Sequence, residues 1–389
     1  MVEQKLYFTT AERSGDLFAG EVIDTLREHE QSACLRVRAV GGSELASRCE
    51  GPEIDTGPLN VLGFWEGIKA YRDVARISTA IAEDIVRYRP DAAILVDSWG
   101  LSLRIAQKVR AKAPSIKLIK LIGPQVWASR AGRAKTLAAS VDHLLCIHDF
   151  EEPYYKPYGL ETTVIGHPAL ARAERLEGSA FRIQYGLADD QDMLLVLPGS
   201  RPAEIDRVAP VLIEAAKCVA RQKPDLKVCV APAESILDDF KKVFPDLPKD
   251  WLILEDEARR YEAMAESILA LSCSGTVNSE LAVQRTPFIT GYRIGAISWF
   301  LMKNFFLKAK FITLLNMAAD DMVALELLQD GMTVKALEAG AIGLLDDPVL
   351  REEQCKAQDR ALQTMGYGGT PAAMLAAEAI LSVVRSAAT

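Results

Sequence analysis

Short apolar runs and longer amphipathic stretches follow one another along this chain in a regular order. A short apolar run bounded by turn residues is typical of a buried parallel strand, whereas apolar positions that recur every three or four residues predict a helix. Predicted strands cover residues 6–10, 35–40, 92–96, 117–122, 144–147 and 162–165 in the first half, and 194–197, 227–231, 251–254, 268–271 and 287–290 in the second. Because helical patterns separate these runs, the sequence predicts an α/β fold with two Rossmann-like domains built on parallel sheets.

The pattern changes at places that we interpret as domain boundaries. Residues 169–178 lack strand character and are typical of a linker. Later helical patterns cover residues 204–222, 323–329, 334–345, 350–365 and 371–385. We expect one domain over residues 1–168, a second over residues 169–365, and a C-terminal segment over residues 366–389 whose helix can pack back on the first domain.

Composition narrows the class of protein. The chain has 389 residues, of which 49% are hydrophobic and 25% charged, and this is typical of a globular protein. A formal net charge of −8 disfavours a nucleic-acid partner. The 7 cysteines are scattered and form no CxxC pair, so neither a zinc site nor a disulfide framework is expected. There is no signal-peptide pattern and no long apolar run, so we expect a cytoplasmic protein.

Two glycine turns in the second half are candidate anion sites. The first joins a predicted strand to a helix through Gly199 and Ser200, and Arg201 adds a cation that can bind phosphate oxygens. Alone, this turn is equally compatible with an ordinary strand-to-helix connection. The second turn is Ser274-Gly275-Thr276, with Glu280 inside the following helix as a possible acceptor for ribose hydroxyls or as a capping residue. Two such turns in one domain favour a nucleotide diphosphate as the ligand.

Polar residues in the first half follow predicted strands, at the edge of a parallel sheet where ligands bind. Glu12 and Ser14 lie in a polar turn after the first strand. Asp97 ends the third strand, where it can act as a general base or cap the next helix. Trp127 lies in a loop after the fourth strand and can form a ligand wall or pack as ordinary loop structure. His167 is more typical of hydrogen-bonded structure than of a catalyst.

Two aromatic segments have two possible interpretations. Phe64 and Trp65 precede a helical stripe that is usually core, although it can also serve as a surface for a lipid chain. Residues 292–319 contain no acidic residue and combine lysines with aromatic side chains such as Trp299. This composition suits an anionic membrane surface, and equally a buried helix whose lysines extend to solvent.

The order of the motifs is more specific than any one of them. It closely resembles that of the bacterial lipid-A-disaccharide synthases, which are glycosyltransferases of family 19 with the two-lobed GT-B fold. The residues that carry the resemblance are Ala11-Glu12-Arg13-Ser14-Gly15-Asp16, Leu62-Gly63-Phe64-Trp65-Glu66, Asp97, Pro124-Gln125-Val126-Trp127-Ala128, Gly166-His167-Pro168, residues 197–204, Ser274-Gly275-Thr276 with Glu280, Tyr292-Arg293 and Leu314-Leu315-Asn316.

The resemblance implies an inverting, metal-independent transferase that needs no cofactor. It would move 2,3-diacylglucosamine from UDP to the 6-hydroxyl of 2,3-diacylglucosamine 1-phosphate and release UDP. By resemblance, the catalytic residues would be Asp97 as the base, Asn316 and Glu12. The nucleotide-sugar site would comprise Gly199, Ser200, Arg201, Ser274, Gly275, Thr276, Glu280 and Arg293. The acceptor and lipid would contact Ser14, Phe64, Trp65, Trp127 and Trp299.

The same resemblance implies where the protein works. The first domain would bind the lipid acceptor and the second the UDP-sugar donor. Association with the anionic inner face of the inner membrane, and a homodimer, are also expected.

Several residues depart from the family pattern. After Asp97 the family usually continues Ser/Ala-Pro-Asp-Phe-Asn, whereas this chain has Ser98-Trp99-Gly100-Leu101-Ser102. Ala11, Ser129 and Leu315 are further departures. Because most of these lie in the first half, a divergent member is expected, with a different membrane-lipid acceptor or a non-catalytic paralogue as alternatives. A nucleotide-sugar epimerase shares the same general plan.

Overall fold

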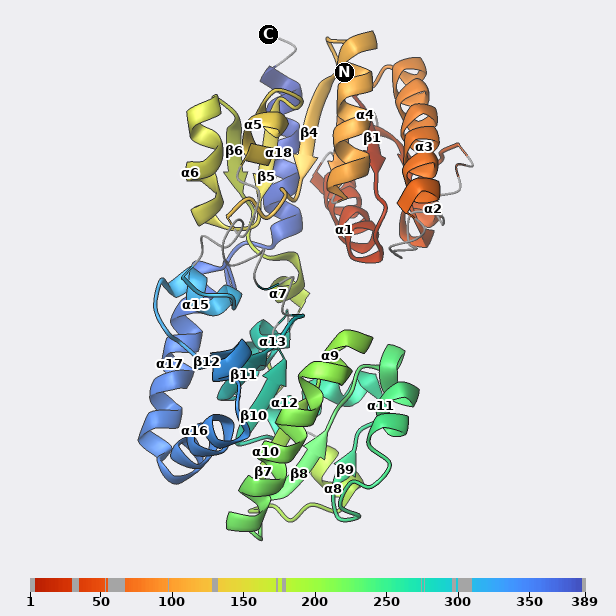
Figure 1. Cartoon of the computed structure of the whole chain (residues 1–389). Helices are drawn as coiled ribbons and strands as arrows, with labels where there is room; N and C mark the ends of the chain where they lie inside the picture. The colour runs from red at the N-terminus through yellow and green to blue at the C-terminus, as the bar shows by residue number, and fades with distance from the viewer. Residues whose placement is uncertain are drawn as a thin grey trace. The chain divides into compact units, whose positions relative to one another are not determined.

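The computed structural model of the chain contains two compact units (Figure 1). One comprises Met1–Pro168 with Gly368–Thr389, and the other comprises Ala169–Tyr367. The structure describes residues 4–29, 35–52, 54, 67–96, 98–127, 132–172, 174–176, 180–273, 275, 277–295, 299 and 310–386.

The first unit is built on a six-stranded parallel sheet with the order β2-β1-β3-β4-β5-β6. Its strands are β1 (Gln4–Thr9), β2 (Leu35–Val40), β3 (Ala92–Val96), β4 (Lys117–Leu121), β5 (His143–Cys146) and β6 (Glu161–Val164). Its helices are α1 (Arg13–His29), α2 (Ser43–Arg48), α3 (Gly67–Tyr88), α4 (Trp99–Lys112), α5 (Gly132–Ala138), α6 (Glu152–Tyr155) and α18 (Ala372–Ser386), with short 3-10 turns η3 (Asp149–Glu151) and η4 (Lys156–Tyr158).

Alternate strand residues of this sheet face two separate apolar layers. Phe8 and Ile94 pack with α1 and with the C-terminal helix α18. Tyr7 and Leu95 face the other side, against α3 and α4. Figure 1 shows α18 in blue beside β5, so the end of the chain completes the core of the first unit.

The second unit repeats this plan with a six-stranded parallel sheet in the order β12-β11-β10-β7-β8-β9. Its strands are β7 (Met193–Leu197), β8 (Lys227–Val230), β9 (Leu252–Ile253), β10 (Leu269–Cys273), β11 (Phe288–Tyr292) and β12 (Glu326–Leu328). Its helices are α7 (Pro168–Arg172), α8 (Phe181–Tyr185), α9 (Pro202–Arg207), α10 (Ala209–Gln222), α11 (Leu237–Val243), α12 (Arg260–Ala265), α13 (Val277–Val283), α15 (Leu314–Ala319), α16 (Val334–Asp346) and α17 (Pro348–Thr364), with 3-10 turns η5 (Glu234–Ile236), η6 (Glu257–Arg259) and η8 (Gln329–Gly331).

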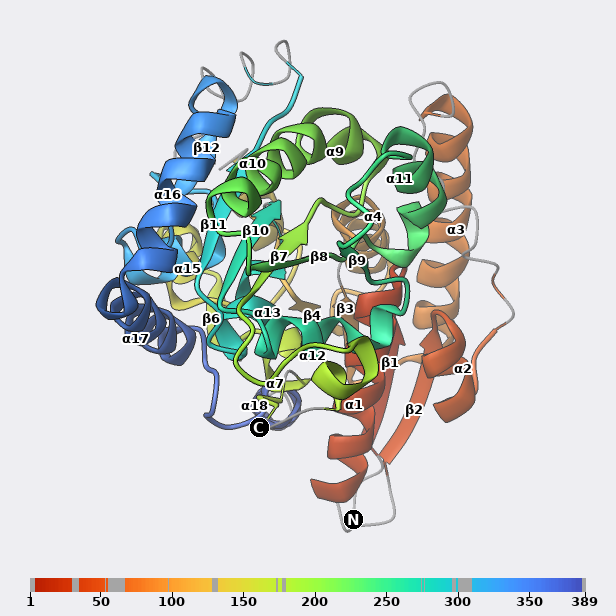
Figure 2. The same ribbon diagram turned by 90° about the horizontal axis from the view of Figure 1, so that it is seen from below.

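Helices cover both faces of the second sheet. Figure 2 shows α10 on one side of β7 and β10, with α12 and α13 on the other side. The predicted α/β class, with two Rossmann-like domains and a C-terminal helix that packs back, is therefore confirmed.

Three local predictions were wrong. Residues 323–329 were expected to be helical, but Glu326–Leu328 forms the edge strand β12, because pairing with β11 outweighs the helix preference of Glu and Leu. The helix expected over residues 204–222 is divided at Val208 into α9 and α10, and Pro210 lies in the first turn of α10, where its missing N–H is tolerated. Ser14, which was expected in a polar turn, instead lies in the first turn of α1, which begins at Arg13.

Candidate functional site

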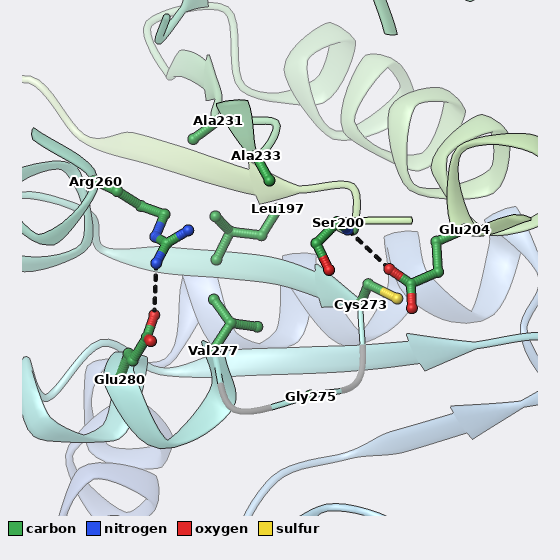
Figure 3. Close-up of a pocket in the computed structure, with 11 residues that line it drawn as sticks. Leu197, Ser200, Glu204, Ala231, Ala233, Arg260, Cys273, Gly275, Val277 and Glu280 are labelled. Atoms are coloured by element: carbon green, nitrogen blue, oxygen red, sulfur yellow. Dashed lines mark hydrogen bonds and ion pairs between the residues drawn. The ribbon is translucent and has the colours of Figure 1, made fainter. Parts of the chain in front are cut away.

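A pocket of about 120 Å³ lies at the carboxyl ends of β7, β8 and β10 in the second unit (Figure 3). This is the edge at which open parallel sheets bind ligands. The pocket is lined by Leu197, Gly199, Ser200, Glu204, Ala231, Ala233, Arg260, Cys273, Gly275, Val277 and Glu280. It therefore brings together residues from both of the glycine turns that the sequence had singled out.

The first turn is held in shape by the carboxylate of Glu204. Its Oε2 accepts hydrogen bonds from the backbone N–H groups of Ser200, at 2.8 Å, and Arg201, at 3.3 Å. Gly199 has φ of 120°, a conformation that residues with a side chain rarely adopt. A Cβ atom at Gly199 would lie 2.6 Å from Glu204 Oε2. The turn consequently depends on glycine and on Glu204 together.

Arg201 extends into solvent from the first turn and takes no part in the core. Its side chain is 75% exposed, and its Nη1 lies 3.6 Å from Glu204 Oε1. An ion pair as exposed as this one contributes about 0–1 kcal/mol. The guanidinium can therefore reorient at low cost.

The second turn contributes Gly275 and Glu280, while Ser274 and Thr276 lie outside the described residues. Glu280 is 17% exposed, and its Oε2 accepts a hydrogen bond from Arg260 Nη2 at 3.3 Å (Figure 3). Arg260 also donates from Nη1 to Glu257 Oε1 at 2.8 Å. One guanidinium thus bridges two carboxylates at one end of the pocket.

Burial governs the electrostatics of Glu280. Loss of solvent raises the pKa of its carboxyl group, and the positive charge of Arg260 and a hydrogen bond from Tyr261 act in the opposite direction. Sequence reasoning missed Arg260, because Arg259 and Arg260 are adjacent in a polar stretch with no motif. Only the structure distinguishes the arginine that lines the pocket.

Three predicted residues of the second unit, Arg201, Arg293 and Asn316, do not line this pocket. Arg293 donates from Nη2 to the backbone carbonyls of Gln329, at 3.2 Å, and Met332, at 2.7 Å. Asn316 is fully buried, and its Nδ2 donates to Ala324 O at 2.8 Å and to Glu326 Oε1 at 2.9 Å. Both side chains therefore fix the backbone of the unit.

In the first unit the predicted acceptor residues are at the carboxyl edge of the sheet or lie outside the described residues. Glu12 and Ser14 are exposed, in the loop after β1 and at the start of α1. Trp127 is 9% exposed and packs edge-to-face on Phe150, with ring centroids 5.6 Å apart. Asp97, Phe64 and Trp65 lie outside the described residues.

The same edge of the first sheet carries buried ionisable groups that the sequence did not reveal. Burial raises the pKa of Glu151 to about 7, although its Oε1 accepts hydrogen bonds from Ile147 N and His148 N. Burial lowers the pKa of His148 to about 3. Lys120 is 1% exposed and donates to Leu95 O at 3.1 Å, so a buried amine lies at the carboxyl end of β3.

The proposed membrane segment is described at its two ends. Trp299 is half-buried, and residues 296–298 and 300–309 lie outside the described residues. Lys310 Nζ lies 4.7 Å from the ring centroid of Phe311, which is buried. After residue 309 the segment therefore combines an exposed cation, Lys310, with a buried aromatic ring, Phe311.

Among the residues that the structure describes, no group of three or more His, Cys, Asp or Glu side chains is arranged to hold a metal ion. In the same part of the chain, no helix is long and apolar enough to cross a membrane.

Solved structures share this fold at low sequence identity. A glycosyltransferase from Rickettsia africae aligns with a TM-score of 0.58 at 14% identity, covering 100% of both chains. A UDP-GlcNAc 2-epimerase from Neisseria meningitidis, bound to UDP-GlcNAc, aligns with a TM-score of 0.59 at 10% identity, covering 99% of this chain and 100% of its own. At such identity the likeness establishes the two-domain fold and does not separate transferase from epimerase.

Comparison of sequences is more specific. The lipid-A-disaccharide synthase of Paramagnetospirillum magneticum is 33% identical over 385 residues, which cover 98% of this chain and 97% of the relative. That of Prochlorococcus marinus is 32% identical, covering 94% of this chain and 96% of the relative. The family model described as lipid-A-disaccharide synthetase matches residues 6–380. The chain therefore belongs to the lipid-A-disaccharide synthetase family.

Proposed function

We propose that this chain is a lipid-A-disaccharide synthase. It transfers 2,3-diacylglucosamine from UDP to the 6-hydroxyl of 2,3-diacylglucosamine 1-phosphate and inverts the configuration at the transferred carbon. The observation that carries the proposal is the pocket in which the Gly199 turn and Glu280 meet, in a chain whose family match extends over residues 6–380.

The donor is assigned to this pocket by chemistry. Glu280 is a half-buried carboxylate that can accept hydrogen bonds from ribose hydroxyls, and Arg201 is an exposed cation that can bind the diphosphate. Ser274 and Thr276 belong to the second turn and are proposed to contact the diphosphate as well. Negative charge develops on the departing UDP, so a cation in the Gly199 turn stabilises the transition state.

The acceptor hydroxyl needs a base, because an alcohol is a weak nucleophile until its proton is removed. Asp97 directly follows β3, and we assign it this role. As the acceptor oxygen attacks the anomeric carbon, its proton passes to Asp97 and the bond to the UDP oxygen breaks. Asn316 and Arg293 are proposed to position the donor unit, and Glu12, Ser14 and Trp127 to line the acceptor side.

The reaction is tested with purified protein, UDP-2,3-diacylglucosamine and 2,3-diacylglucosamine 1-phosphate. We expect UDP release together with a disaccharide 1-phosphate detected by mass spectrometry. A heat-inactivated sample and a reaction without acceptor serve as controls. If neither product exceeds these controls, the proposed reaction is wrong.

A second candidate keeps the donor and changes the acceptor to another membrane lipid. The observation behind it is the sequence after Asp97, where Trp99 begins α4 and its ring centroid lies 5.1 Å from Arg133 Cζ. An aromatic ring and a cation at this edge offer a different surface to the acceptor from the family's usual Pro-Asp-Phe-Asn. UDP release with a crude lipid extract, but none with the diacylglucosamine 1-phosphate, would favour this candidate.

We also propose that the protein works as a homodimer at the anionic inner face of the inner membrane, with Phe64, Trp65 and Trp299 at the lipid. Acylated substrates reside in that membrane, and the lysines of residues 292–319 suit anionic lipid. Co-sedimentation with anionic vesicles should weaken as salt rises, and light scattering should give twice the chain mass. Absence of binding at low salt would contradict the membrane proposal, and the mass of a single chain would contradict the dimer.

A further inference from the structure

Arg260 occupies an unusual place in the donor pocket. It begins α12, lines the pocket, and donates to Glu257 on one side and to Glu280 on the other. Its Nε is buried and has no hydrogen-bond partner among the described residues. Leaving a buried donor unpaired costs free energy, so an arginine that served stability alone would be poorly suited to this position.

The carboxylate that Arg260 contacts is the one proposed to meet the nucleoside. Arg260 Nη2 donates to Oε2 of Glu280, and this restrains the orientation of a carboxylate that lies within the first turn of α13. Figure 3 shows this pair at one end of the pocket and the Ser200–Glu204 pair at the other. The pocket therefore has one carboxylate that holds the Gly199 turn and a second that is oriented by an arginine.

Arg260 could bind the diphosphate directly or could orient Glu280, and its charged neighbours distinguish these two roles. A guanidinium that already donates to two carboxylates has most of its positive charge compensated, and this weakens its attraction for a diphosphate. Arg201, 75% exposed, is far less compensated. Direct phosphate binding is thus better suited to Arg201, and Arg260 is better suited to act through Glu280.

We propose that Arg260 is a positioning residue that orients Glu280 to accept hydrogen bonds from the ribose hydroxyls, and thereby makes the pocket select a ribonucleotide over a 2′-deoxyribonucleotide. The inference rests on the proposed function, since it takes the ligand to be a UDP-sugar. Without Arg260, the carboxylate would lose its fixed orientation. It would also lose the positive charge that favours its ionised, hydrogen-bond-accepting form.

The test compares the affinities of UDP and 2′-deoxy-UDP, measured by calorimetry on the full-length protein. In the wild type we expect UDP to bind about tenfold or more tightly than 2′-deoxy-UDP, since the lost hydrogen bond is to a charged group. In Arg260→Gln this ratio should fall to about twofold or less. Arg260→Lys keeps the charge but not the two-pronged geometry, so its ratio should lie between the two.

Arg259→Gln is the matched control. Arg259 is the neighbouring arginine and is also bound to a carboxylate, with Nη1 3.0 Å from Glu262 Oε2, but it does not line the pocket. This variant should keep the wild-type ratio. A pH series adds a second readout, with Glu257, Arg260 and Tyr261 as the charged or titratable groups around Glu280. Because removing Arg260 raises the pKa of Glu280 further, the ratio in Arg260→Gln should recover as pH rises.

The outcomes separate this inference from the proposed function. If UDP binds the wild type but Arg260→Gln weakens both ligands equally and keeps the ratio, Arg260 does not act through Glu280. If Arg260→Gln does not fold, a wild-type ratio in Arg260→Lys would overturn the proposal in the same way. If UDP does not bind the wild type at all, the proposed donor site fails and the role of Arg260 fails with it.

Discussion

Gly199→Ala tests whether the shape of the first turn controls donor binding. Gly199 has φ of 120°, and an added Cβ would lie 2.6 Å from both Cβ and Oε2 of Glu204. The new methyl group and the Glu204 side chain cannot both keep their places. We expect the carboxylate to be displaced, so that the N–H groups of Ser200 and Arg201 lose their acceptor.

Backbone strain and lost hydrogen bonds together set the expected loss of unfolding free energy. A side-chain-bearing residue forced into this backbone region costs about 1–3 kcal/mol. Loss of hydrogen bonds to a buried charged group adds about 1.5–3 kcal/mol, and Glu204 is 7% exposed. The second unit should therefore lose about 3–5 kcal/mol of unfolding free energy. UDP affinity should fall by about tenfold or more, because the turn that presents Arg201 is no longer held.

Gly186→Ala is the matched control for backbone strain. Gly186 has φ of 65° in the same unit, and an added Cβ would meet no atom within 4 Å. The unfolding free energy of this variant should fall by about 1–2 kcal/mol, and its affinity for UDP should equal that of the wild type. Urea unfolding and calorimetric titration with UDP measure the two quantities. If Gly199→Ala matches Gly186→Ala in stability and the wild type in UDP affinity, the assignment of the turn is wrong.

Three other substitutions test separate parts of the molecule. Asp97→Asn should lower turnover by about 100-fold and leave UDP affinity unchanged, and a normal rate would remove Asp97 from the mechanism. Asn316→Ala should lower the unfolding free energy by about 2–3 kcal/mol, because it leaves Ala324 and Glu326 without their buried partner, and an unchanged urea midpoint would contradict this role. Glu151→Gln should change the pH dependence of stability. Burial raises the pKa of Glu151 from 4.5 to about 7, so the folded state binds an extra proton between these values. The unfolding free energy of the wild type should therefore rise relative to that of this variant by about 1.4 kcal/mol per pH unit as pH falls from 7 to 4.5. Parallel curves of stability against pH would refute the raised pKa.

The strands were predictable because a strand that is buried on both faces has a continuous run of apolar residues. The run from Met193 to Leu197 is fully buried and became β7 as expected. Glu326–Leu328 carried no such signal, since an edge strand of three residues is stabilised by its pairing with β11 rather than by its own composition. The break at Val208 was signalled by Pro210, which belongs to a first helical turn and not to a helix interior.

The two glycine turns that line the pocket could be predicted from the sequence, whereas the contacts that support them could not. Gly199 and Glu280 were identified because glycine turns and nearby carboxylates recur where nucleotides bind. The role of Glu204 had a weaker signal, since it stands three residues after Arg201, the spacing of a reciprocal cap. Arg260 had none, because the contact with Glu280 joins α12 to α13 across 20 residues of sequence.

In the Gly199 turn, Glu204 holds the backbone in shape, and Arg201 is the side chain proposed to bind the ligand. Ser200 and Arg201 N–H groups already donate to Glu204, so this carboxylate occupies donors that a phosphate would otherwise use. The Arg201 guanidinium lies 3.6 Å from the same carboxylate and is exposed, so a diphosphate, with more charge and more acceptor oxygens, can attract it away at little cost. When it leaves, Glu204 keeps its backbone hydrogen bonds and the turn keeps its shape. In the proposed donor site a carboxylate beside the diphosphate is therefore compatible with binding, because Glu204 holds the backbone from which Arg201 would reach the ligand.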